Sequence, residues 1–249
     1  MKVALQGVSK TFNGVNDAPL VALNPITLEV AAGEFVCIIG PSGCGKSTLL
    51  RLIADQIPAT AGSIDLDDAP PGAARKAKQI AWMAQNPALL PWQTVLDNVW
   101  LPQRVNRRQQ PHAPAPPELL RVVGLADFAH AYPGTLSGGM QQRVALARAL
   151  ATGAQLWLMD EPFAALDELT RETLSDEVLH LWQTFRPTVL WVTHNIVEAA
   201  RLADRVIVMT ARPGRIQATV HIPQSRPRDE TAPGTAAVVR RLRAVLREQ

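Results

Sequence analysis

The chain has 249 residues, with 25 Lys and Arg against 22 Asp and Glu, so its formal charge is only +3. These charges are not gathered in long runs of one sign, so the sequence gives no reason to expect nucleic acid as a partner. A chain of this length can bury a large core, which favours one α/β unit over two independent domains. No apolar run reaches the roughly eighteen residues that a membrane span needs, and the chain is expected to be soluble on its own.

Short apolar runs predict the buried strands of the fold. They lack the alternation of apolar and polar residues that a strand with one solvent face shows, so both faces are expected to be covered. Helical segments separate most of these runs, which is typical of an α/β fold. The runs are Phe35–Ile39, Leu156–Met159, Val189–Val192 and Val206–Met209.

Other segments have weaker patterns. Gly62–Leu66 alternates as a short strand does, and Ala73–Lys78 is compatible with a helical turn. Pro102–Pro117 contains five prolines, which predicts a surface loop inside a helical excursion. The chain from Pro223 is loop-like and ends in a basic helix, Thr235–Glu248, which is either a solvated helix or a contact with an anionic membrane surface.

The two cysteines indicate the redox compartment. Cys37 lies in the first apolar run and Cys44 in the glycine-rich loop that follows it. A disulfide between them would distort both segments, so we expect free thiols in a reducing, cytosolic compartment.

That glycine-rich loop predicts a nucleotide site. It fits the pattern G-x-x-x-x-G-K-[ST] and lies between an apolar strand and an amphipathic run, Ser47–Ile57, which is the context the pattern requires. Gly43 and Gly45 let backbone N–H groups approach the β- and γ-phosphates. Lys46 supplies a positive charge between these phosphates, and the Ser47 hydroxyl suits Mg²⁺. The loop consists of Gly40, Pro41, Ser42, Gly43, Cys44, Gly45, Lys46, Ser47 and Thr48.

Two adjacent carboxylates end the second apolar run. Successive side chains of a strand point to opposite sides, so Asp160 and Glu161 cannot have the same role. Asp160 suits the Mg²⁺ shell, whereas Glu161 is left to orient and deprotonate an attacking water. The alternative is that Glu161 only caps the turn at Pro162.

His194 ends a third apolar run. Ligands of open α/β sheets lie beyond the carboxyl ends of the strands, so Gly40, Asp160 and His194 are expected to face one pocket. A histidine there can donate a hydrogen bond to the γ-phosphate and lose that contact when the phosphate leaves. The alternative is a histidine with a purely structural role.

The segment Leu136–Arg143 predicts a second anion site. Ser137 is a natural N-cap of the helix that follows, and Gly138 and Gly139 expose N–H groups at its positive end. One chain needs a single phosphate loop, so the extra site suggests a nucleotide held between two copies. With this segment the chain resembles the ATPases of ATP-binding cassette (ABC) transporters.

The resemblance covers about residues 3–220 and implies a P-loop NTPase core with an antiparallel β-subdomain and a helical subdomain. We expect an ATPase domain at 1–222, with the helical subdomain near 86–155, and a basic tail at 223–249. ATP and Mg²⁺ are the implied ligands. The implied catalytic residues are Glu161, His194 and Lys46, and the implied metal ligands are Ser47, Gln85 and Asp160.

The resemblance also implies contacts across a dimer. Ser137, Gly138 and Gly139 would touch the ATP of the other copy, and Asp167 would lie in the loop that crosses the interface. Gln85 would sense Mg²⁺ and touch a membrane partner.

Two positions depart from the common pattern. Phe12 stands where a tyrosine often stacks on adenine, so it either stacks or is an ordinary strand residue. Met140 stands where glutamine is commoner.

Three segments are similar to those of nitrate, sulfonate and taurine importers. In such importers the subunit pairs with itself beneath two integral membrane subunits, on the cytoplasmic side of the inner membrane, and a solute-binding protein delivers the solute. The groove that receives a membrane subunit would be lined by Leu89, Leu90 and Trp92. The alternative is that these residues serve ordinary packing within the helical subdomain. The alternatives are a pyrimidine or vitamin-precursor importer, an ABC exporter, a soluble cassette protein and a P-loop kinase. The segments are Asn86–Val99, Asp160–Arg171 and Ala211–Ile216.

Overall fold

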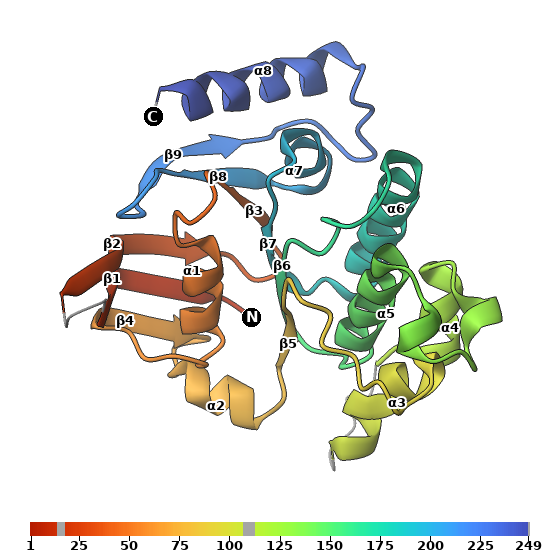
Figure 1. Cartoon of the computed structure of the whole chain (residues 1–249). Coiled ribbons are helices and arrows are strands. Elements are labelled where there is room, and N and C mark those ends of the chain that lie inside the picture. Colours follow the sequence, from red (N-terminus) through yellow and green to blue (C-terminus); the bar gives the residue numbers. More distant parts are fainter. Residues whose placement is uncertain (14–17, 107–112, 249) are drawn as a thin grey trace. The chain divides into compact units, whose positions relative to one another are not determined.

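The computed structural model describes residues 1–13, 18–106 and 113–248, which form two compact units (Figure 1). The first unit comprises Met1–Ala77 and Thr188–Gln249, and the second comprises Lys78–Pro187. Residues 107–112 of the predicted proline-rich loop and Gln249 of the tail lie outside the described residues. No helix in the described part of the chain combines the length and the apolarity that a bilayer span requires.

An antiparallel sheet opens the first unit, as the resemblance implied. Its three strands, in the order β2-β1-β4, are β1 (Val3–Asn13), β2 (Pro19–Val30) and β4 (Ala61–Leu66). Val3 pairs with Val30 on one side and with Leu66 on the other, so the apolar ends of all three strands meet. The side chains of these three residues are buried.

Parallel strands form the core of the first unit, and their apolar runs were predicted correctly. β3 (Phe35–Ile39) pairs in parallel with β7 (Thr188–Val192) and with β8 (Arg205–Met209), and β9 (Ile216–His221) pairs antiparallel with β8. Every residue of β3 and β7 is buried. Because Ile38 pairs with Val192, the chain leaves both strands at the same edge of the sheet.

Two helices of the first unit differ from their predicted bounds. α1 (Lys46–Ile53) was expected to reach Ile57 but stops four residues earlier. The reason is Asp55, whose φ of 55° takes the backbone out of the helix and whose carboxylate accepts a hydrogen bond from Arg75 Nε at 2.9 Å. Arg75 belongs to α2 (Pro71–Lys76), which starts two residues before the predicted turn because proline is favoured at a first helical position.

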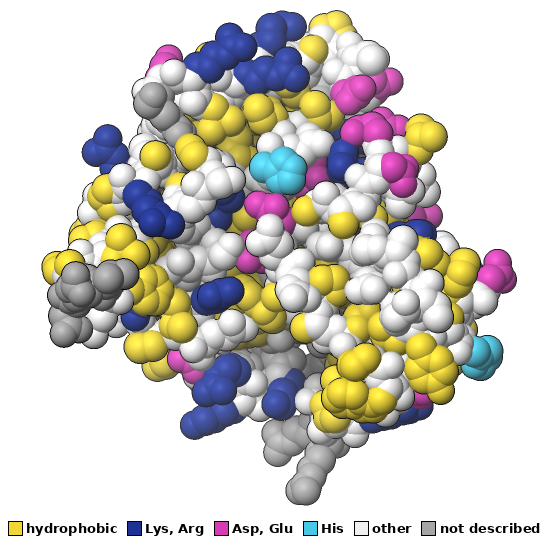
Figure 2. Space-filling model, viewed as in Figure 1, with side chains coloured by type: hydrophobic (Ala, Val, Ile, Leu, Met, Phe, Trp, Pro, Cys, Tyr) yellow, Lys and Arg dark blue, Asp and Glu magenta, His cyan; other side chains and the backbone are white. Residues whose placement is uncertain are grey.

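The C-terminal segment is part of the first unit. α8 (Pro233–Arg247) packs against α7 (Ile196–Leu202) and β8, and Gln217 of β9 donates to the Val245 carbonyl at 3.1 Å. Val238, Val239 and Leu242 are buried. Figure 2 shows Lys and Arg side chains gathered over this helix. Its exposed arginines are Arg240, Arg241, Arg243 and Arg247.

Two arginines before α8 fix the carboxyl end of α7. Arg228 is 6% exposed and donates to the main-chain carbonyls of Ala200, Arg201 and Ala203, with the shortest distance 2.6 Å. Burial lowers the pKa of Arg228 to about 10, so the guanidinium keeps its charge at neutral pH. Arg226 donates to the Leu202 carbonyl at 2.7 Å and pairs with Asp204. These bonds satisfy carbonyl groups that a helix end leaves free.

Replacing Arg228 with methionine is expected to lower the free energy of unfolding by about 2 to 4 kcal/mol, because the carbonyl groups would stay buried without donors. Urea unfolding measures this loss. Arg240→Met is the matched control: Arg240 is exposed on α8, so its replacement is expected to change the free energy by less than about 0.5 kcal/mol. Equal losses in the two variants would contradict the assigned role of Arg228.

The second unit combines two parallel strands with helices. β5 (Ile80–Met83) pairs with β6 (Leu156–Asp160), and α5 (Gly138–Leu150) packs against β5. Two other helices pack against α5: α3 (Val95–Val105) and α4 (Pro116–Val122). The remaining elements are the 3₁₀ helices η2 (Ala126–Phe128) and η3 (Pro133–Thr135) and the helix α6 (Glu168–Phe185).

The proline-rich region is more regular than predicted. α3 continues through Pro102 to Val105, although Pro102 was expected to lie in a loop. Proline removes one hydrogen-bond donor from a helix. The end of α3 is held instead by an ion pair between Arg104 and Asp97 at 2.8 Å and by the Asn106 N–H, which donates to the Pro102 carbonyl.

Candidate nucleotide site

The phosphate loop joins β3 to α1 in the first unit. Gly45 stands at the N-cap of α1 with a φ of 99°, a conformation that residues with a side chain rarely adopt. A Cβ atom at this position would also lie 2.5 Å from Leu23 Cδ2. The close approach of β2 therefore requires glycine here, and it fixes the point at which the loop becomes helix.

Lys46 carries its charge inside this loop. Its side chain is buried, with 6% of its surface exposed, and Nζ donates to the carbonyls of Gly40 at 2.8 Å and Pro41 at 2.9 Å. Among the described residues, Lys46 forms no ion pair. A buried charge is costly unless it is paired, so this loop is arranged to receive an anion.

His194 follows β7 in the same unit. It is exposed, and the turn that carries it is fixed by its neighbours. Asn195 N–H donates to Thr193 Oγ1 at 3.0 Å, and Asn195 Oδ1 accepts from the backbone N–H groups of Val197 and Glu198 at the start of α7. Because β7 and β3 are parallel neighbours, His194 and the phosphate loop follow strands that end at the same edge of the sheet.

The carboxylates lie in the second unit. Asp160 ends β6 and is 3% exposed. Glu161 has a φ of 51°, which is uncommon for a residue with a side chain. Its carboxylate oxygen Oε2 accepts a hydrogen bond from Gln85 Nε2 at 3.4 Å, so two predicted site residues meet here. The Glu161 carbonyl oxygen accepts a hydrogen bond from the Ala164 N–H, so this main-chain bond closes the turn that contains Pro162.

Ser137 is the N-cap of α5, as predicted. Its Oγ accepts from the Met140 N–H at 3.2 Å, which leaves the two glycines at the positive end of the helix. A Cβ atom on Gly139 would lie 2.8 Å from the Ala165 carbonyl oxygen. The start of α5 thus packs closely against the loop that follows Glu161.

Asp167 ends that loop and caps α6. Its carboxylate accepts from the Thr170 N–H at 2.9 Å and from the Thr170 hydroxyl at 2.7 Å. These bonds lower the pKa of the Asp167 carboxyl, which keeps it ionised at neutral pH. The second unit therefore brings together Gln85, Glu161, the start of α5 and the start of α6.

The predicted site residues fall in both units. The first unit contains the phosphate loop, His194 and Phe12. Phe12 is 36% exposed, and Lys10 Nζ lies 5.0 Å from the centroid of its ring. The second unit contains Gln85, Ser137, Gly138, Gly139, Asp160, Glu161 and Asp167.

Two side chains that the sequence did not single out contact the predicted residues. Arg212 Nε donates to the Gly43 carbonyl at 2.9 Å, and Gln142 Nε2 donates to the Glu161 carbonyl at 3.0 Å. The signal for Gln142 was available, because it lies three and four residues before the buried Ala145 and Leu146 on the apolar face of α5. No comparable signal exists for Arg212.

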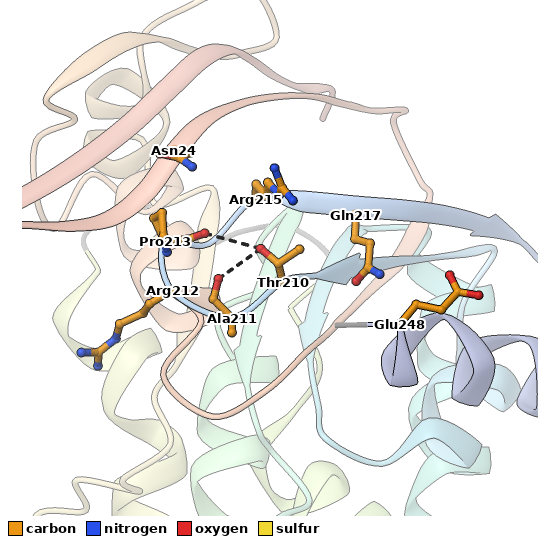
Figure 3. Close-up of a pocket in the computed structure, with 8 residues that line it drawn as sticks. All are labelled: Asn24, Thr210, Ala211, Arg212, Pro213, Arg215, Gln217 and Glu248. Carbon is orange, nitrogen blue, oxygen red and sulfur yellow. Dashed lines mark hydrogen bonds between the residues drawn. The ribbon is translucent and has the colours of Figure 1, made fainter.

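A cavity of about 340 Å³ in the first unit lies beside Arg212 (Figure 3). Two of its donors are used within the protein: the Thr210 hydroxyl donates to the carbonyls of Ala211 and Pro213, and Gln217 donates to Val245. None of the phosphate-loop residues lines it, so we do not assign ATP to this cavity. Its walls are formed by Asn24, Thr210, Ala211, Arg212, Pro213, Arg215, Gln217 and Glu248.

The donor set predicted for Mg²⁺ suits an ion that arrives with a nucleotide. In the described part of the chain, no group of three or more His, Cys, Asp or Glu side chains could hold a metal by itself. In nucleotide sites, Mg²⁺ is bound by one or two carboxylates together with phosphates and water. Ser47, Gln85 and Asp160 offer oxygen donors of that kind, with Asp160 the only carboxylate among them.

A glycine-rich loop between a parallel strand and a helix, with a buried lysine inside it, defines a P-loop nucleoside triphosphatase. Residues 23–164 match the family model described as ABC transporter. The chain belongs to this family as an ATP-binding subunit, and it is an ATPase.

Similar proteins include the nitrate import ATP-binding protein NrtD of Synechococcus elongatus, 43% identical over 90% of this chain and 82% of that protein. The aliphatic sulfonates import ATP-binding protein SsuB 2 of Burkholderia cenocepacia is 42% identical over 88% of this chain and 80% of that protein. A dimeric structure of a post-hydrolysis state of the ATP-binding cassette MJ0796, bound to ADP and Pi, has a TM-score of 0.79. It is 32% identical and covers 90% of this chain and all of that one.

Proposed function

We propose that this chain is the ATP-hydrolysing subunit of an importer and that two copies close head to tail around two ATP molecules. The observation that carries ATP binding is Lys46, a buried cation inside a loop of phosphate-binding pattern, whose described partners are the carbonyls of Gly40 and Pro41 and the Cys44 sulfur. The proposal that each ATP is held between two copies rests on the predicted anion site at Ser137 and on the dimeric form of the similar cassette.

In this proposed dimer each predicted site residue has one role. Lys46 and the loop N–H groups bind the β- and γ-phosphates, and Phe12 offers an exposed ring for the adenine. Glu161 takes a proton from the attacking water, while His194 donates to the γ-phosphate. Ser47, Gln85 and Asp160 would hold Mg²⁺, which neutralises phosphate charge when bound. Ser137, Gly138, Gly139 and Asp167 would face the ATP bound by the other copy.

The importer assignment rests on the names of similar proteins. Relatives at 42 to 43% identity are named for the import of nitrate and of aliphatic sulfonates. We therefore propose uptake of a small solute such as nitrate, a sulfonate or taurine. The partners would be two integral membrane permease subunits at the cytoplasmic side of the inner membrane, supplied by a solute-binding protein.

The loop around Trp92 supports a membrane-subunit contact. Asn98, which is 0% exposed, accepts from the Leu90 N–H and donates to the carbonyls of Leu90, Gln93 and Thr94. The loop is thus held rigidly from beneath, yet Trp92 on it is 69% exposed. A large apolar side chain that is held out into solvent by a fixed loop is typical of a protein contact.

Trp92→Asp is expected to prevent co-purification of this chain with an integral membrane protein from membranes of its own cells. A desolvated aspartate in an apolar groove is costly. Affinity purification followed by mass spectrometry of the bound proteins measures this loss. Recovery of a solute-binding protein after crosslinking supports an importer, whereas a complex that never contains one supports an exporter.

Phe128→Asp is the matched control for this experiment. Phe128 is 43% exposed on η2 in the same unit, and it is not part of the Trp92 loop. Its replacement should leave the membrane protein in the purified complex. Loss of the membrane protein in both variants, or in neither, would contradict the proposed contact.

A further inference from the structure

The backbone of Glu161 is held in an uncommon conformation. With a φ of 51°, it occupies the left-handed region that glycine or asparagine usually fills. Such conformations persist only where the surroundings impose them.

Two donors converge on the Glu161 carbonyl oxygen. Ala164 N–H donates at 3.2 Å from the following turn, and Gln142 Nε2 donates at 3.0 Å from α5. The turn bond is local and would move together with the loop. Gln142, in contrast, is anchored on a helix whose buried residues fix its position.

Gln142 is placed to make a strong constraint. Its side chain is only 4% exposed, so a lost partner would not be replaced readily by water. Its neighbours Val144, Ala145 and Leu146 are buried, so α5 cannot rotate to follow a displaced carbonyl. The carboxylate of Glu161 is meanwhile contacted by Gln85 at 3.4 Å. Gln142 thus bonds the main chain of Glu161, whereas Gln85 bonds its side chain.

We propose that Gln142 is a positioning residue for Glu161. Its amide holds the main chain of Glu161 so that the carboxylate faces the attacking water. Gln142 also lies five residues after Ser137, the N-cap of the same helix, α5. The start of α5 is proposed to contact the ATP bound by the other copy. The same helix would then also position Glu161 for the ATP bound by its own chain. This inference rests on the proposed catalytic role of Glu161.

The first measurement compares kcat and KM of the Gln142→Met variant with those of the wild type. Methionine keeps the length and apolar volume of the side chain but removes the donor. We expect kcat to fall on the order of tenfold to a hundredfold, as small misplacements of a catalytic group do. KM for ATP should stay within about twofold, since the phosphate loop is untouched.

Gln103→Met is the matched control. Gln103 lies in the same unit, and its amide also donates to main-chain carbonyls, those of Pro114 and Ala151, both at 3.0 Å. The same atoms are removed, but from α3 and from bonds that do not involve Glu161. Its kcat should remain near the wild-type value. An equal fall in both variants would overturn the inference.

The second measurement uses ATP-dependent dimer formation by size-exclusion chromatography in a Glu161→Gln background. If Gln142 acts on the base alone, adding Gln142→Met should leave the dimer intact, because binding does not need the base. Loss of the dimer would show that Gln142 serves the fold or the Ser137 site, and would overturn the inference. Wild-type hydrolysis by Glu161→Gln alone would instead remove the proposed role of Glu161.

Discussion

Glutamine in place of Glu161 is expected to reduce steady-state ATP hydrolysis by about a hundredfold to ten-thousandfold, the usual contribution of a general base. The amide has nearly the same shape as the carboxylate, so the contact with Gln85 can persist. It cannot accept a proton from water at neutral pH. The phosphate loop is unchanged, so ATP should still bind and the variant should accumulate as an ATP-loaded dimer.

Phosphate release measures kcat, and light scattering coupled to size-exclusion chromatography measures the dimer. Glu118→Gln provides the control, because Glu118 is an exposed carboxylate of α4 in the same unit whose ion pair with Arg121 spans 3.5 Å. Exposed pairs of this kind contribute little, so kcat should hardly change. Undiminished hydrolysis by Glu161→Gln would remove the assignment of Glu161 as the base.

Arginine in place of Ser137 is expected to abolish hydrolysis without abolishing ATP binding. Ser137 belongs to the proposed second anion site, which a head-to-tail dimer would present to the ATP of the other copy. A bulky cation there would block the contact with that ATP, whereas the phosphate loop of the same chain lies in the first unit and stays intact. The dissociation constant for ATP should therefore change by less than about threefold, well under 1 kcal/mol.

A mixing experiment separates a shared site from a self-contained one. Ser137→Arg retains a working phosphate loop, and Lys46→Ala retains a working Ser137. Mixed dimers would contain one complete site, so two inactive variants should together recover up to roughly a quarter of the wild-type activity. The wild type should also gain specific activity with concentration. No recovery on mixing, with activity independent of concentration, would indicate that one chain completes its own site.

Loss of the N-cap is the other effect of Ser137→Arg, and it has its own control. Thr94 caps α3 by accepting from the Asp97 N–H at 3.1 Å, which is the same kind of bond. Thr94→Ala should lower stability by about 1 kcal/mol and leave hydrolysis near the wild-type rate. A comparable loss of hydrolysis in Thr94→Ala would assign the Ser137 effect to helix capping.

The sequence predicted the buried strands because their residues obey one strong rule. A strand that is covered on both faces has no polar alternation, and Phe35–Ile39 and Leu156–Asp160 are buried throughout. The phosphate loop was predictable for a similar reason, since close approach to phosphate restricts the residue types. Helix ends were harder, because α1 ends at Ile53, just before a left-handed Asp55 that an apolar pattern does not reveal.

The carbonyl groups that Gln142 and Arg212 contact could not be predicted from the sequence, although the place of Gln142 on the buried face of α5 could be. Gln142 and Arg212 donate to the carbonyls of Glu161 and Gly43, and a carbonyl is the same group in every residue. No residue type at the accepting position therefore marks the contact in the sequence. The left-handed conformation of Glu161 is hidden in the same way, because it results from its surroundings in the fold.

The hydrogen bonds from Arg226 and Arg228 to the carboxyl end of α7 have a consequence for truncated forms of this protein. α7 has only seven residues, and helices this short do not persist by themselves in water. A chain cut before Arg226 would still carry every residue that we predict for the ATP site, including His194. It would nevertheless lose the donors that close the far end of the helix beginning after His194. Sequence motifs alone would classify such a fragment as a complete ATPase, although His194 would precede a helix with a frayed carboxyl end.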